Sequence, residues 1–171
     1  MASTPAAILK TVLFLRVFTL LALAASVVLM GLNNFTEDGI KARFTDLIAY
    51  RYVFATGAIG FLYTLIQIPF AVYNVVKEKR WIRTGFLQEF DFYGDKVMAF
   101  LVASGVGVGF GVSFELKRVL GDVLSRKSKK FLDMGNISAG LLLVGFVSMA
   151  LLCIISSNRR SSSSPIRGFF K

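Results

Sequence analysis

The chain contains no histidine and a single cysteine, Cys153, among its 171 residues. A Ser-His-Asp triad, a histidine base and a metal site of histidine and cysteine ligands are therefore excluded. One cysteine also cannot form a disulfide within the chain, which disfavours folds that depend on extracellular disulfides. We accordingly expect no enzymatic activity, no catalytic residues, no metal and no cofactor.

Acidic residues are scarce as well. The chain has 10 Asp and Glu against 20 Lys and Arg, a formal net charge of +10. Hydrophobic residues make up 55% of it, and the mean hydropathy is +0.66. This composition is typical of a polytopic membrane protein rather than a soluble domain. Since the bases lie in short connections and the tail, with no basic and aromatic platform beside them, we expect membrane lipids as partners and no nucleic acid.

Four apolar runs are long enough to cross a bilayer, which takes about 20 apolar residues. A lone segment satisfies its backbone in lipid only as a helix. The sequence therefore predicts an all-α fold, a polytopic membrane protein built as a four-transmembrane-helix bundle. The predicted spans are about 11–32, 52–76, 92–114 and 132–156, preceded by a short N-terminus, 1–10, and followed by a disordered serine-rich tail, 157–171.

The third run is the centre of the pattern, because it is uncharged from Val97 to Phe114 and rich in small residues. At helical spacing these residues form two faces: Ala99, Ala103, Gly107 and Gly111 on one, and Gly105, Gly109 and Ser113 on a roughly opposite one. Small residues let helices approach closely in a membrane. We expect one face to pack against the first helix, and the other to receive the second helix, the fourth helix or a second protomer.

Arg16, Gln67 and Asp95 are polar side chains inside the predicted spans that need a partner or a packed site. Arg16 lies roughly 7 to 8 Å into the first span, and Asp95 at a similar depth in the third, which runs parallel to it. An intramembrane carboxylate needs a partner, so we predict an ion pair between Arg16 and Asp95. The alternatives are an Arg16 that snorkels to the headgroups and Lys96 as the partner of Asp95. Beside Pro69, Gln67 is expected to be a packed amide at a kink.

The first connection, 33–51, is polar, but Phe44, Leu47 and Ile48 recur at helical spacing within it. This pattern predicts a short amphipathic helix on the membrane surface. The connections do not decide the orientation of the chain, because the two sides of the membrane hold equal numbers of Lys and Arg.

Several short motifs accompany the two charges: Tyr50-Arg51-Tyr52, Gln67-Ile68-Pro69-Phe70, Phe90-Asp91-Phe92-Tyr93-Gly94-Asp95-Lys96 and Glu115-Leu116-Lys117-Arg118. Together they resemble the Casparian strip membrane domain protein-like family of plants, relatives of the MARVEL tetraspan membrane proteins. The likeness covers residues 8–156. It implies four spans, a plasma-membrane location, both termini in the cytoplasm and homo- or hetero-oligomers with family members.

The best-known members of that family form a membrane scaffold that recruits cell-wall-modifying enzymes and makes a diffusion barrier. The resemblance therefore implies a non-enzymatic, laterally oligomerising scaffold with cell-wall enzymes as partners. The first connection lacks the longer signature of the strip-forming members, so a general scaffold role is expected. Two alternatives stay open: a small transporter or channel subunit that uses the intramembrane charges, and a small membrane enzyme working through Arg, Asp or Tyr.

Overall fold

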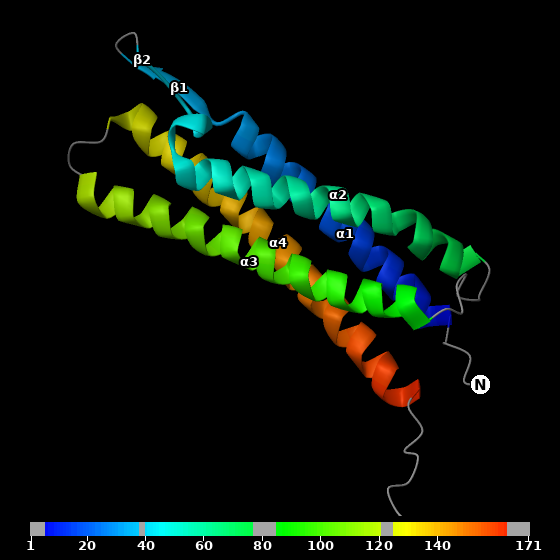
Figure 1. The fold of residues 1–171 in the computed structure, drawn as a ribbon. Coiled ribbons are helices and arrows are strands. Elements are labelled where there is room, and N and C mark those ends of the chain that lie inside the picture. Colours follow the sequence, from blue (N-terminus) through cyan, green and yellow to red (C-terminus); the bar gives the residue numbers. More distant parts are fainter. Residues whose placement is uncertain (1–5, 38–39, 77–84, 121–124, 164–171) are drawn as a thin grey trace, which may run out of the picture.

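The computed structural model describes residues 6–37, 40–76, 85–120 and 125–163. Within these residues four helices are long and apolar enough to cross a membrane. They are α1 (Ala6–Gly31), α2 (Ile48–Val76), α3 (Gly85–Leu120) and α4 (Arg126–Ser163). The predicted all-α, four-helix membrane fold is confirmed (Figure 1).

The four helices form a bundle in which each packs against two neighbours. α1 lies beside α2 and α4, and α3 lies beside the same two helices, so α1 and α3 face each other across the diagonal (Figure 1). The expectation that α3 packs directly against α1 is wrong, because its close neighbours are α2 and α4. The length of an apolar run predicts that a helix crosses the membrane. It does not predict which helices become neighbours or how far each is rotated about its axis.

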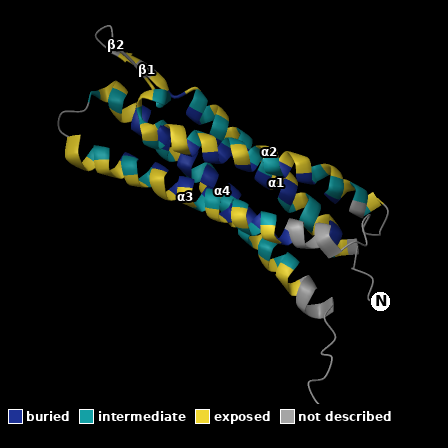
Figure 2. Cartoon of the chain, in the orientation of Figure 1, coloured by how far each residue is buried: buried dark blue, intermediate teal, exposed yellow. Residues whose placement is uncertain are grey.

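The bundle has an apolar core and an apolar outer surface. Leu23, Tyr50, Val102 and Leu142, one from each helix, are almost fully buried in a single cluster. Many other large apolar residues are exposed, such as Phe100, which is 77% exposed. Exposed residues recur along all four helices (Figure 2). An outer surface of this kind is stable where lipid tails replace water.

The connection between α1 and α2 differs from the predicted amphipathic helix. It forms an antiparallel hairpin of β1 (Asn34–Glu37) and β2 (Ile40–Arg43), followed by the short 3-10 helix η1 (Phe44–Asp46). Asn33 anchors its base, since its side-chain amide donates to the Phe131 carbonyl of α4 at 3.0 Å. The apolar spacing instead belongs to η1 and the first turn of α2, which begins at Ile48.

The C-terminal helix also extends past the predicted span end at residue 156. α4 continues to Ser163 and so includes the first part of the segment expected to be a disordered tail. The remainder of that tail, 164–171, lies outside the described residues.

Candidate functional site

The structure brings Arg16 of α1 and Asp95 of α3 together inside the bundle. The two guanidinium nitrogens donate to the two carboxylate oxygens at 3.1 and 3.4 Å, which is a bidentate arrangement. Arg16 is 6% exposed and Asp95 4% exposed. The long arginine side chain thus crosses the diagonal that separates α1 from α3.

Arg16 therefore turns into the bundle instead of snorkelling outward. Lys96, the other candidate partner of Asp95, places its ammonium 4.0 Å from the centre of the Phe92 ring. This is the geometry of a cation–π contact, which suits a base on the rim of the bundle.

Two residues of α2 extend the ion pair into a network. The Tyr63 hydroxyl donates at 2.8 Å to Asp95 Oδ1, the oxygen that also accepts the 3.4 Å bond from Arg16. The Gln67 amide donates to the Tyr63 hydroxyl at 3.1 Å. Gln67 is 4% exposed, so the polar residue predicted inside the second span lies in the interior. Sequence reasoning missed Tyr63, although its spacing of four residues from Gln67 places both on one face of a helix.

The residue before Asp95, Gly94, lies against Tyr63. A Cβ atom added at Gly94 would lie only 2.7 Å from the Tyr63 hydroxyl oxygen. A larger side chain would push the tyrosine away from the carboxylate that it binds. The glycine in the Phe90–Lys96 motif therefore leaves room for Tyr63 of α2 beside Asp95.

The small residues predicted to pack on α3 fall into two groups. Gly105 meets Thr56 of α2, and a Cβ at Gly109 would lie 2.9 Å from the Ala139 Cβ of α4. Ala99 is also buried, at 7% exposure, and Ala103 is half-buried.

The second group does not pack inside the monomer. Gly107 and Gly111 are exposed, and a Cβ added at either would meet nothing within 4 Å. The predicted face that joined them to Ala99 is therefore split, because Ala99 points inward while the two glycines point toward the lipid side.

Hydroxyl groups supply further contacts between helices that apolar periodicity did not reveal. Ser26 of α1 and Ser138 of α4 each donate to the other's backbone carbonyl at 2.8 Å. The Tyr50 hydroxyl of α2 and the Ser113 hydroxyl of α3 lie 2.8 Å apart. In lipid such bonds replace water, and each stabilises helix association by roughly 1 kcal/mol.

The four polar side chains of the network are hydrogen-bonded to one another. Among the described residues no three His, Cys, Asp or Glu side chains gather in a group that could hold an ion. Arg16, Tyr63, Gln67 and Asp95 instead satisfy one another at one end of the bundle. A site of this kind fixes the arrangement of α1, α2 and α3.

The sequence from residue 5 to residue 148 matches the family described as the Casparian strip membrane protein domain. The CASP-like protein 4D1 of Populus trichocarpa is 41% identical over 152 residues, which cover 86% of this chain and 84% of the relative. The chain belongs to the CASP-like family. The resemblance inferred from the motifs is thereby confirmed, and the protein is a multi-pass membrane protein.

Other CASP-like relatives also match over most of their length. The CASP-like protein 4D1 of Glycine max is 37% identical over 147 residues, covering 85% of this chain and 83% of the relative. The CASP-like protein 4D2 of Arabidopsis thaliana is 35% identical over 164 residues, covering 91% and 92%. No solved structure matches this CASP-like chain.

Proposed function

We propose that this CASP-like protein is a plasma-membrane scaffold. It assembles laterally with copies of itself or with other family members, organises a membrane domain and recruits cell-wall-modifying partners. Both termini lie in the cytoplasm. Membership of a family named for a membrane structure supports the proposal, and the outer surface of α3 supplies its physical basis.

The observation that carries the proposal is the outer glycine pair, Gly107 and Gly111. The two residues are one helical turn apart, exposed, and surrounded by open space in the monomer. A glycine inside a helix is destabilising by about 1 kcal/mol relative to alanine, and no contact within the described part of the chain requires it here. A neighbouring protomer does require it, because two helix backbones approach closely in lipid only over small side chains.

The residues beside the outer glycine pair fit the same role. Phe100 is 77% exposed and Phe114 61% exposed, and these large rings lie on either side of the glycines along α3. The two glycines thus lie between two exposed aromatic residues along the helix. A second helix that packs over the glycines and against these rings would gain the van der Waals contacts that drive association in a bilayer.

The test combines Gly107→Leu with Gly111→Leu and measures the mass of the protein in mild detergent and its lateral diffusion in the membrane. We expect the variant to insert and fold but to form smaller, faster-diffusing species. Gly140→Leu on α4 is the matched control, since a Cβ there also meets nothing within 4 Å. Gly105→Leu is the opposite control, because it collides with Thr56 and should damage the monomer itself.

Unchanged mass and diffusion in the Gly107 and Gly111 variant would move the interface to another surface. If the native protein is itself a freely diffusing monomer, the scaffold function is refuted. The transporter or channel function would then take its place, with the network of Arg16 and Asp95 as the feature to examine.

A further inference from the structure

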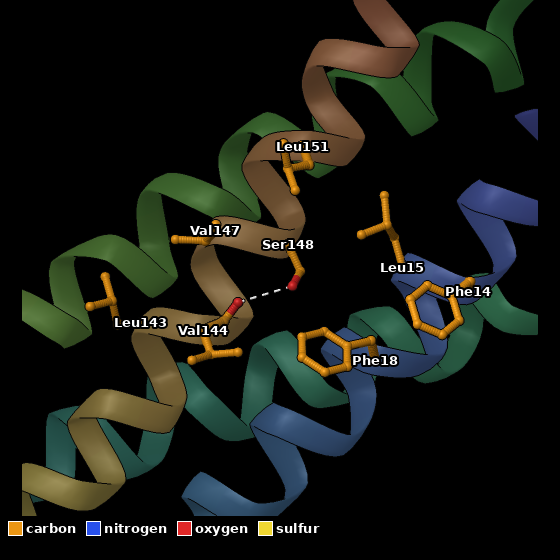
Figure 3. Close-up of a pocket in the computed structure, with 8 residues that line it drawn as sticks. All are labelled: Phe14, Leu15, Phe18, Leu143, Val144, Val147, Ser148 and Leu151. Atoms are coloured by element: carbon orange, nitrogen blue, oxygen red, sulfur yellow. Dashed lines mark hydrogen bonds between the residues drawn. The ribbon is translucent and has the colours of Figure 1, made fainter.

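A groove of about 380 Å³ lies between α1 and α4, and neither Arg16 nor Asp95 lines it. Figure 3 shows its walls: Phe14, Leu15 and Phe18 come from α1, and Val147 and Leu151 are among those from α4. Phe14 is 68% exposed and Val147 49% exposed. The groove is therefore open to the surrounding lipid, and no side chain that the structure describes fills it.

The groove offers a ligand almost nothing polar. Ser148 is the one hydroxyl residue among its walls, and its hydroxyl donates to the Val144 carbonyl of its own helix at 3.0 Å (Figure 3). Ser148 is also 4% exposed. The chemistry of these walls selects a hydrocarbon chain, since a polar group placed there would lose its hydrogen bonds to water.

A positive charge stands at one end of the groove. Lys10, Phe14 and Phe18 follow one another at four-residue spacing on α1, so they share a side of the helix. The rise of 1.5 Å per residue places Phe14 and Phe18 about 6 and 12 Å deeper than Lys10. That distance matches the run of a lipid chain from its headgroup toward the bilayer centre, about 15 Å away.

A base near a membrane surface favours anionic lipid by about 1 kcal/mol. Lys10 therefore gives the mouth of the groove a preference for a negatively charged headgroup.

We propose that the α1–α4 groove is a binding site for one anionic phospholipid. Its acyl chain lies along Phe14 and Phe18 against Val147 and Leu151, and its phosphate-bearing headgroup is held by Lys10. The charge at the mouth favours this occupant over a sterol, which has no anionic group. It also favours it over a second copy of this chain, which would bring another Lys10 and its like charge to a symmetric contact.

The experiment uses the full-length protein in detergent. Dioleoyl phosphatidylserine and dioleoyl phosphatidylcholine are added in equal amounts, and the lipid retained is counted by native mass spectrometry. We expect the serine lipid to be retained preferentially. A phosphatidylserine with a photoreactive diazirine in its acyl chain should label peptides containing 14–18 or 143–151.

Two variants test the binding of the acyl chain and the binding of the lipid headgroup separately. Val147→Trp fills the groove and should abolish retention, whereas Val97→Trp on α3, at a site that is 63% exposed and outside the groove, should not. Lys10→Gln should weaken the preference for the serine lipid by about fivefold, which corresponds to about 1 kcal/mol.

Five outcomes would overturn the proposal. The first is equal retention of the two phospholipids, and the second is photolabelling spread evenly over all four helices. The third is that Val147→Trp behaves like Val97→Trp. If cholesterol or sitosterol displaces the lipid from the labelled peptides, or if Val147→Trp breaks an oligomer that retains no lipid, the occupant is a sterol or a second copy and the proposal fails.

Discussion

Removing one member of the Arg16–Asp95 pair should destabilise the bundle far more than removing both. Both residues are at least nine-tenths buried and joined by two charge-assisted hydrogen bonds. Breaking a buried pair by deleting one partner typically costs about 3 to 5 kcal/mol, because the remaining charge stays unpaired away from water. We therefore expect Arg16→Leu and Asp95→Leu each to lower the free energy of unfolding by about that amount.

The double variant has a smaller expected cost. With both charges gone, the main remaining penalty is the Tyr63 hydroxyl, which loses its acceptor on Asp95. A buried polar group left unpaired costs about 1 to 3 kcal/mol. The two substitutions should thus be strongly non-additive, with a coupling energy of several kcal/mol.

The assay is reversible unfolding in mixed micelles by increasing sodium dodecyl sulfate, followed by circular dichroism. Lys96→Leu is the matched control, since it removes a neighbouring charge that lies over the Phe92 ring, and its cost should be about 1 kcal/mol. A double variant as unstable as the sum of the single variants would refute the pairing. So would an Arg16→Leu variant that is no less stable than Lys96→Leu.

Three further predictions concern the neighbouring contacts and the orientation. Gly94→Ala should cost about 1 to 2 kcal/mol in the same titration because its Cβ crowds the Tyr63 hydroxyl, and less in a Tyr63→Phe background; equal costs in both would exclude that contact. Ser138→Ala should cost about 1 kcal/mol through the lost bond to Ser26, and an unchanged unfolding curve would contradict this. A tag at the C-terminus should resist protease added to intact cells and be digested after permeabilisation, whereas digestion in intact cells would place the tail outside.

The sequence predicted those parts of the fold that depend on length and depth. Four apolar runs of sufficient length can only be helices in a bilayer, and that inference needs no tertiary information. Helices 1 and 3 must run parallel in a four-span chain, so the matching depths of Arg16 and Asp95 made their pairing predictable. The cost of an unpaired charge in lipid leaves few other solutions.

The remaining features depend on how far each helix is rotated about its axis. Rotation decides that Gly105 and Gly109 face Thr56 and Ala139 while Gly107 faces outward, and a run of alternating glycines carries no mark of this choice. Helix rotation also brings Tyr63 to Asp95, and no sequence motif around Tyr63 indicates this contact. The hairpin of β1 and β2 was not predicted, because the apolar spacing of Phe44, Leu47 and Ile48 lies after it, in η1 and at the start of α2, and indicates nothing about residues 34–43.

The diagonal position of the ion pair has a consequence for how the protein is made. Arg16 and Asp95 are 79 residues apart in the chain, so at a synthesis rate of about 5 to 20 residues per second Arg16 precedes its partner by about 4 to 16 seconds. During that interval the first helix carries a charge that nothing in the chain yet neutralises. It must therefore stay near water or in contact with the insertion machinery until the third helix arrives. The ion pair can therefore form only after three of the four helices have been synthesised.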